Sequence, residues 1–316
     1  MKISEKLEII VITYNRSKYL RNTLLTLLSK DSPLQHCTIT IIDNNSSDST
    51  YDICKSYQQE YSNIVYIKNP YNIGWADITQ AFFIAKKDYV WVLADDDYLD
   101  FTYWNQVEDA IQDNMDIICC CKHFLNTVIN KDSMENLLIQ ASLLPACIYK
   151  TSFFDDTLMK NMHDNNYTMF PHLTAFITAI NNNLKIQILE NEILKIGIHV
   201  DETDCSYTRG LSTNKIWPRN RNMVWLVGFA NILSGLNDIK LAEKTIDVAI
   251  LQDWVYGSYT NMAKSITKMY KNKLYQNKIF DIYSMVGFKL KCIILYYFFY
   301  TQIKNIFKYL RGGNHD

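Results

Sequence analysis

The chain has 316 residues, of which 48% are hydrophobic, so it can bury a large core in one domain or in one domain with a substantial extension. A net charge of −1 gives no global electrostatic basis for nucleic-acid binding, and the start MKISEKLEII lacks the long apolar region of a signal peptide. Cys119, Cys120 and Cys121 lie inside an apolar segment, which indicates buried thiols rather than zinc ligands or disulfides. We therefore expect a cytoplasmic protein that does not bind nucleic acid.

Strand and helix patterns alternate along the first part of the chain. The predicted strands are Leu7–Thr13, Thr38–Ile42, Ile64–Ile67 and Tyr89–Leu93, and the predicted helices between them are Lys18–Ser29, Ser49–Tyr61 and Ile78–Lys86. Ser17 is the predicted N-cap of the first helix. Strands that alternate with single helices predict βαβ units, a parallel sheet and right-handed crossovers, which is an α/β fold.

Polar residues follow each of these strands. They are Tyr14-Asn15-Arg16, Asp43-Asn44, Asn72 with Gly74, and the three consecutive acids Asp95, Asp96 and Asp97. The carboxyl ends of parallel strands meet at one edge of a sheet, where open α/β sheets bind their ligands. Singly, each group has a simpler interpretation, because Asp43 can cap a helix and Gly74 can form a turn. Their recurrence at one edge favours a binding rim.

The three acids that end the fourth strand are the strongest feature of this rim. Two close carboxylates repel each other unless a cation or a proton lies between them, and oxygen-rich clusters suit Mg²⁺ or Mn²⁺. The alternative is a solvated acidic turn, which needs no partner.

Four motifs at natural spacing carry a resemblance to a known family. They are VITYNRSKYLRNTLLTLL, IIDNNSSDST, NPYNIGWAD and DYVWVLADDDYLD. Together they resemble the family 2 glycosyltransferases with the GT-A fold, a mixed Rossmann-like sheet flanked by helices, and the acidic strand end resembles the DxD motif. The ADDD arrangement is similar to abequosyltransferase-like bacterial members. Because Ala94 stands where many relatives carry an acid, which two of Asp95, Asp96 and Asp97 bind the metal and ribose stays open.

The resemblance implies a role for each rim residue. The donor, a nucleoside diphosphate sugar with UDP as the favoured nucleotide, would contact Thr13, Tyr14, Asn15, Arg16, Asp43, Asn44, Asn72, Gly74, Asp95 and Asp96. Mn²⁺ or Mg²⁺ would be held by Asp97 and Asp95, and would offset charge on the leaving diphosphate. His199 resembles a late third metal ligand, and its alternative interpretation is an exposed loop histidine.

The expected catalytic base lies near a later helix. We predict a helix from Pro171 to Asn181, preceded by a polar and irregular segment from Asp155 to Tyr167. Inverting members usually carry an acid just before this helix, whereas His172 stands there in this chain. Histidine can accept a proton near neutral pH, so His172 or Asp164 is the candidate base. The other interpretation is that His172 only caps or packs the helix.

Helical periodicity dominates from Met223 to the end, which predicts a GT-A domain in residues 1–212 and a helical region in residues 213–316. The apolar run Cys292–Tyr300 is too short to span a bilayer, and the lysines around it suit a helix on an anionic membrane surface. The alternative is packing on the catalytic domain or on a second subunit of a homo-oligomer.

The sequence therefore predicts a metal-dependent glycosyltransferase, either cytoplasmic or peripheral on the inner face of the cytoplasmic membrane. It would transfer a sugar, with inversion, to a hydroxyl of a surface glycan, such as lipopolysaccharide or capsule, or of a lipid-linked oligosaccharide. One alternative is an inactive nucleotide-sugar-binding subunit, which the missing acidic pair near His172 supports. A sugar nucleotidyltransferase is another, although Tyr14-Asn15-Arg16 is not the Gly-rich loop that cradles a triphosphate.

Overall fold

The computed structural model describes residues 2–121, 133–195 and 217–251, and beyond them residues 258, 261–262, 291–293, 295–296, 299–300 and 303; for residues 217–224 it describes the backbone only. The chain forms two compact units, Met1–Leu125 with Gln140–Arg219, and Asn126–Ile139 with Asn220–Asp316. The domain boundary predicted between residues 212 and 213 stays a prediction. The sheet and all the described rim residues belong to the first unit.

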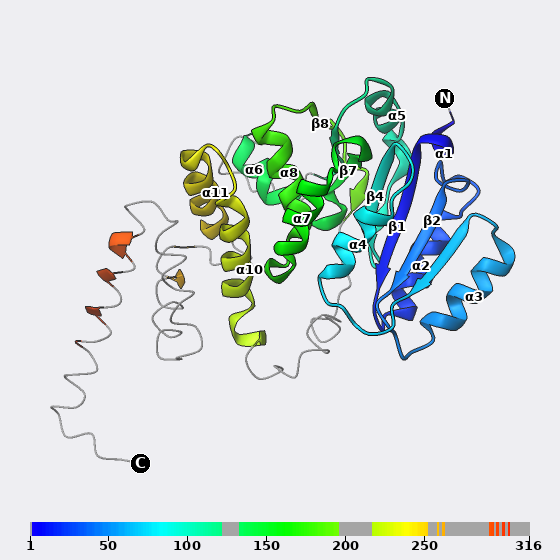
Figure 1. Cartoon of the computed structure of the whole chain (residues 1–316), viewed down its shortest axis with the longest axis horizontal. Coiled ribbons are helices and arrows are strands. Elements are labelled where there is room, and N and C mark those ends of the chain that lie inside the picture. Colours follow the sequence, from blue (N-terminus) through cyan, green and yellow to red (C-terminus); the bar gives the residue numbers. More distant parts are fainter. Residues whose placement is uncertain are drawn as a thin grey trace, which may run out of the picture. The chain divides into compact units, whose positions relative to one another are not determined.

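A mixed sheet of seven strands forms the core of the first unit (Figure 1). In spatial order the strands are β3 (Ile64–Lys68), β2 (Thr38–Asp43), β1 (Leu7–Thr13), β4 (Tyr89–Ala94), β7 (Cys147–Lys150), β6 (Ile117–Cys119) and β8 (Ile186–Ile188). Strands β1 to β4 are parallel, as predicted, whereas β7 runs antiparallel to both β4 and β6. Every residue of β1 is buried, because helices cover both faces of the sheet.

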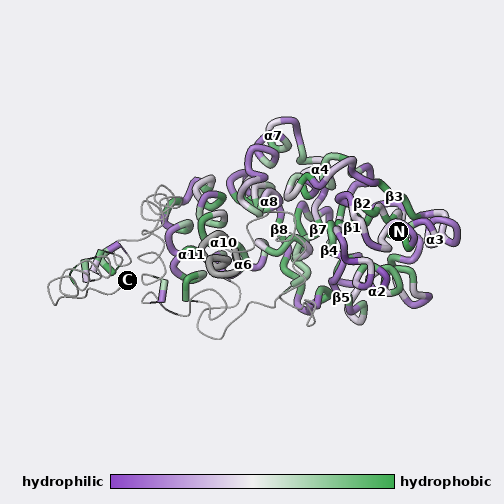
Figure 2. The backbone as a smooth tube through the Cα atoms, turned by 90° about the horizontal axis from the view of Figure 1, so that it is seen from below, coloured by the Kyte–Doolittle hydropathy of each residue, from purple (hydrophilic) through white to green (hydrophobic). Residues whose placement is uncertain are grey.

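Helices pack on the two faces of this sheet. Helix α4 (Ala76–Ile84) packs on β1 and β4 and also contacts α7 (Asp156–Asp164) and α8 (Pro171–Asn181). Helix α3 (Thr50–Glu60) packs on β2 and β3 and contacts α2 (Ser17–Leu27). Figure 2 shows α4 and α7 on one side of the strands and α2 on the other. The expected α/β architecture is confirmed.

The order of the strands reverses at β1. The chain adds β2 and then β3 on one side of β1, and β4 then pairs with the opposite side. Such a switch point opens a crevice at the carboxyl ends of the two strands on either side of it. In register, Thr13 pairs with Asp43 and Ile12 pairs with Ala94, so the ends of β1, β2 and β4 lie at one level.

The remaining elements are short or helical. They are α1 (Ile3–Lys6), β5 (Tyr98–Leu99), η1 (Phe101–Tyr103), α5 (Asn105–Gln112), α6 (Met134–Ala141), η2 (Leu144–Ala146), η3 (Thr151–Phe153), η4 (Asn166–Thr168), β9 (Leu194–Lys195), α10 (Trp217–Leu233) and α11 (Ile239–Leu251). Strand β5 pairs with β9 in a separate small sheet. Among the described helices, none is long and apolar enough to cross a membrane.

Three local predictions need correction. Helix α2 begins at Ser17 and its N-cap is Arg16, so Ser17 is not the N-cap. The segment expected to be irregular contains α7, which begins where the Asp155 carboxylate accepts a hydrogen bond from Leu158 N at 2.7 Å. Leu158 and Met162, one turn apart, bury the inner face of this helix. The apolar run around Cys119 also predicts a strand over Asp116–His123, but β6 begins at Ile117 and ends at Cys119.

The prediction of buried thiols is confirmed. Cys119, Cys120 and Cys121 are all buried, and none of the three forms a disulfide.

Candidate functional site

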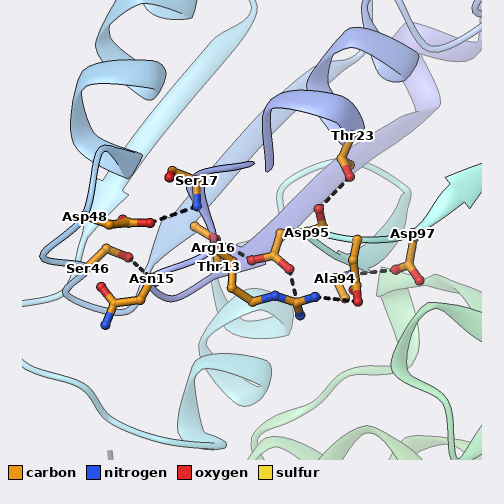
Figure 3. Close-up of polar contacts among 11 residues, drawn as sticks. Thr13, Asn15, Arg16, Ser17, Thr23, Ser46, Asp48, Ala94, Asp95 and Asp97 are labelled. Atoms are coloured by element: carbon orange, nitrogen blue, oxygen red, sulfur yellow. Dashed lines mark hydrogen bonds and ion pairs between the residues drawn. The ribbon is translucent and has the colours of Figure 1, made fainter. Parts of the chain in front are cut away.

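The acidic turn after β4 consists of Asp95, Asp96 and Asp97. Asp95, which is only 2% exposed, connects this turn to β1 and to α2. Its Oδ2 accepts a hydrogen bond from Thr13 Oγ1 at 2.7 Å, and its main-chain oxygen accepts one from Thr23 Oγ1 at 2.7 Å. Its Oδ1 lies 3.1 Å from Arg16 Nη1. Figure 3 shows Asp95 lying between the end of β1 and helix α2. Asp95 therefore ties the acidic turn to both elements.

Arg16 is the positive group of this turn. Its Nη2 donates to Asp96 Oδ2 at 2.6 Å, and its guanidinium carbon lies 4.6 Å from the centre of the Tyr19 ring. The side chain is 10% exposed, so both carboxylate contacts lie largely out of solvent. One guanidinium thus bridges Asp95 and Asp96.

The side chain of Asp97 bonds to the backbone at the end of β4, where the same turn starts. Its Oδ2 accepts a hydrogen bond from Ala94 N at 2.8 Å, and its side chain is half-buried. From the described residues, no hydrogen bond reaches Oδ1 of Asp96 or Oδ1 of Asp97. These two oxygens remain for a ligand.

Among the described residues the charges of the turn do not balance, because the turn holds three carboxylates and one guanidinium contacts it. Burial raises the pKa of Asp95 to about 7, although Arg16 opposes the shift. Burial also raises the pKa of Asp97 well above its ordinary value, and the charge of Asp96 adds to this effect. In the described parts of the chain, no group of three or more His, Cys, Asp or Glu side chains forms a metal site by itself.

Asp43, at the end of β2, has a different environment. It is fully buried, and its Oδ1 accepts from Ser46 N at 2.7 Å while its Oδ2 accepts from Tyr66 Oη at 2.6 Å. Burial raises the pKa of the Tyr66 phenol, and the bond to Asp43 raises it further. Both carboxylate oxygens are therefore already hydrogen-bonded.

The loops after β1 and β2 are joined by side-chain contacts, several of which Figure 3 shows. Asn15, with a left-handed φ of 54°, accepts from Ser47 N at 2.8 Å and donates its own N–H to Ser46 Oγ at 2.8 Å. Asp48 Oδ2 accepts from Ser17 N at 2.9 Å, at the start of α2. The Asn15 side chain thus fixes a loop. Tyr14 is half-buried beside it.

Asn44 is the centre of a second polar cluster and is fully buried. Its Nδ2 donates to Asn72 Oδ1 at 2.9 Å and to Asp77 Oδ2 at 3.0 Å, and lies 3.3 Å from Gly74 O. Gly74 has a φ of 59°, which glycine adopts without strain. Burial raises the pKa of Asp77 to about 8. Asn44 therefore positions the β3–α4 loop and has no exposed atoms for a ligand.

The two candidate bases lie in different environments. His172 is 1% exposed, its Nε2 lies 3.1 Å from Ser142 O, and burial lowers its pKa to about 4. This geometry favours the packing interpretation of His172. Asp164 is exposed at the end of α7 and pairs with Lys160. His199 lies outside the described residues.

A family model decides the identity of the fold. The model for glycosyl transferase family 2 matches residues 8–183, which include β1 to β4 and every described rim residue. The chain belongs to glycosyl transferase family 2. It has the GT-A fold, as the motifs predicted, whereas the narrower likeness to abequosyltransferases stays a prediction.

Curated relatives match only a part of the chain. A poly(ribitol-phosphate) β-glucosyltransferase of Bacillus spizizenii is 31% identical over 96 residues, which are 30% of this chain and 15% of that protein. An uncharacterized glycosyltransferase of Mycoplasma pneumoniae is 33% identical over 93 residues, 28% of this chain and 31% of that protein. The match thus spans less than a third of either relative.

Solved structures extend the likeness to nearly the whole chain. Residues 1–349 of S. aureus TarS give a TM-score of 0.60 at 17% identity, over 98% of this chain and 93% of that one. The same segment in complex with UDP-GlcNAc gives a TM-score of 0.61 at 18% identity, with the same coverage. At this identity the likeness establishes a shared fold.

Three residues that form hydrogen bonds in this site were not among the predicted site residues. They are Thr23, Tyr66 and Asp77. Thr23 carried a usable signal, because it is a polar residue within the buried stripe of Leu20, Leu24 and Leu27. The contacts of Tyr66 and Asp77 depend on how the loops fold, and no spacing rule predicts them.

Proposed function

We propose that this glycosyltransferase binds a nucleoside diphosphate sugar in the crevice between β1 and β4, with UDP as the favoured nucleotide. The base and ribose would lie toward Tyr14 and Asp43, and the diphosphate toward the acidic turn. The observation that carries this proposal is the charge imbalance at the strand-order switch, where the described part of the chain places three acids beside one guanidinium. A ligand that brings both phosphate and a divalent cation would complete such a site.

The residues present fit a divalent metal ion. Asp96 and Asp97 each offer one carboxylate oxygen, and Mg²⁺ or Mn²⁺ is commonly held by one or two carboxylates together with substrate phosphates and water. This agrees with the lack of a three-residue metal site in the described chain. The metal would offset negative charge on the departing diphosphate. Asp95, whose oxygens are engaged by Thr13 and Arg16, would position the turn rather than bind metal.

Exposure supports one of the two candidate bases. His172 is buried against Ser142 and neutral, so an acceptor hydroxyl cannot reach it without local opening. Asp164 is exposed. Two residues later, Asn166 accepts a hydrogen bond at 2.6 Å from the hydroxyl of Thr79, which lies in the first turn of α4. We therefore favour Asp164 as the base that deprotonates the acceptor, and in-line attack would invert the anomeric centre.

The acceptor would be a hydroxyl of a surface glycan or a lipid-linked oligosaccharide. The Bacillus relative is named for a polymer of ribitol phosphate, which supports a cell-surface polymer. Tyr296, Phe299, Tyr300 and Ile303 are each exposed by 52% or more, which supports contact of this segment with a membrane surface or a second subunit. The protein would act in the cytoplasm or on the inner face of the membrane.

A direct test combines binding with turnover. Thermal stabilisation is measured with UDP, GDP, CDP and dTDP sugars, each with and without Mn²⁺, and the release of free nucleoside diphosphate is then followed. We expect stabilisation by one nucleotide class and slow donor hydrolysis. If no nucleotide sugar stabilises the protein, the proposed donor site is wrong. Binding without any release would instead favour an inactive subunit, which remains the second candidate because an acid is missing at His172.

A further inference from the structure

Arg16 forms an ion pair with Asp96, which is one of the two proposed metal ligands. Its guanidinium bridges Asp95 Oδ1 at 3.1 Å and Asp96 Oδ2 at 2.6 Å, and Tyr19 packs on its face. The same turn therefore already contains a resident cation that shares Asp96 with any incoming metal. Two cations cannot approach one carboxylate closely without mutual repulsion.

A diphosphate changes this balance. Guanidinium groups bind phosphate oxygens in the same forked geometry in which they bind carboxylates. Arg16 lies at the N-cap of α2, directly after β1, and therefore on the rim where a diphosphate would arrive. A donor would offer the guanidinium a second anionic partner, while its phosphates would also provide ligands for the metal.

We infer that Arg16 couples metal binding to donor binding. In the free protein Arg16 partly offsets the charge of Asp95 and Asp96 and keeps the affinity for divalent cations low. A nucleoside diphosphate draws the guanidinium toward its phosphates, which releases Asp96 to the metal, so that metal and donor each strengthen the binding of the other. This inference rests on the proposed donor site.

The test measures Mn²⁺ binding to the full chain from the resonance signal of free aqueous Mn²⁺, with and without UDP. In the wild type we expect UDP to tighten Mn²⁺ binding by about tenfold or more, within the usual range of coupling between sites. In Arg16→Gln we expect Mn²⁺ alone to bind about tenfold tighter than in the wild type. UDP should then tighten Mn²⁺ binding by a smaller factor than in the wild type, because only the ligands from its phosphates remain to favour the metal. Arg21→Gln is the matched control, because Arg21 is an exposed charge on the same helix.

A charge-matched variant separates competition from a general change in charge and guards against misfolding of the single variant. Arg16→Gln with Asp95→Asn removes one positive and one negative charge, and the amide oxygen introduced at position 95 can still accept the bond from Thr13. We expect this double variant to bind Mn²⁺ alone more tightly than the wild type, since Asp96 is no longer shared. Wild-type affinity in the double variant, or equal tightening in Arg21→Gln, would overturn the inference.

The two proposals fail in different ways. If none of UDP, GDP, CDP and dTDP, used as probes, binds to the wild type, the proposed donor site fails, yet the comparison of Mn²⁺ affinities without nucleotide still reports on Arg16. If nucleotide binds but Arg16→Gln keeps the wild-type coupling, only the role of Arg16 is wrong.

Discussion

The strands on either side of β1 both end in a buried carboxylate, but the two ends are balanced in opposite ways. At β2, Asp43 has one donor for each oxygen, from Ser46 N and Tyr66 Oη. At β4, Asp95 and Asp96 share Arg16 while Asp97 accepts from Ala94 N, and two oxygens receive no hydrogen bond from the described residues. Burial is therefore common to both, and the supply of donors and counter-charge distinguishes a structural carboxylate from a ligand site.

The largest effect should come from Asp97. In Asp97→Asn the side-chain oxygen still accepts from Ala94 N, so the turn is retained while a metal-binding charge is lost. We expect sugar transfer to fall on the order of 10³-fold, about 4 kcal/mol in the barrier, with no loss of thermal stability.

The control is Asp113→Asn, which neutralises an exposed acid at the end of α5. It should keep full activity. If Asp97→Asn instead lost stability and kept its turnover with saturating Mn²⁺, Asp97 would have a structural role, as Asp43 has, and would not bind the metal.

His172 is a buried titratable group that has no ionic partner among the described residues. Its pKa is about 4 in the folded protein against 6.5 as its ordinary value, so the unfolded chain takes up a proton first as the pH falls. The stabilisation is complete above pH 6.5 and is lost as the pH falls toward 4, by about 3 kcal/mol. Unfolding free energies measured by denaturant titration across this range should show the loss.

His172→Gln should remove this loss, because a glutamine amide can donate to Ser142 O and does not titrate. His36→Gln, at an exposed position, should keep the wild-type dependence. If His172→Gln abolished turnover and left the pH dependence of unfolding unchanged, His172 would be the base after all.

Tyr66→Phe tests the balanced end of the comparison. It leaves Asp43 Oδ2 without its phenol donor in a buried position, which should lower the free energy of unfolding by about 2 kcal/mol. Tyr103→Phe, at an exposed position, should be neutral in the same denaturation experiment. A stability loss no larger than that of Tyr103→Phe would mean that Asp43 is not satisfied through Tyr66, and the contrast with Asp97 would disappear.

The sequence predicts the sheet well because each of its first strands is a short run of apolar residues that is visible locally in the sequence. The β-branched run Leu7–Thr13 has the bounds predicted for it, and the polar residues after each strand lie on one rim. Helix α7 was missed because only Leu158 and Met162 mark its buried face among polar residues. A pattern with so few apolar positions does not distinguish a short helix from a loop.

The candidate site is predicted in composition but not in contacts. The acids after β4 and the residues after β1 stand out in the sequence, yet nothing local indicates that Arg16 bridges Asp95 and Asp96. That Tyr66 occupies Asp43 is equally non-local, since the two residues meet across neighbouring strands. Residue types at strand ends can thus be read from the sequence, whereas the pairing of charges depends on the folded loops.

The smallest effect on stability should come from Asp48, which lies in the loop after β2 and not at either of the two strand ends. Its Oδ2 accepts from Ser17 N at the start of α2, and its Oδ1 accepts from Thr50 N at 3.1 Å at the start of α3. Burial alone would raise the pKa of Asp48, but the hydrogen bonds from Thr50 and Ser17 outweigh it and lower the pKa. Its stabilisation is therefore present at neutral pH and is lost as the pH falls through that lowered value. Asp48→Asn should cost about 1 kcal/mol in denaturation at pH 7, with Asp31→Asn, at an exposed turn position outside any helix, as the control. Because this carboxylate has donors for both oxygens, as Asp43 has, a change in Mn²⁺ affinity in Asp48→Asn would show that balanced acids also contribute to the metal site.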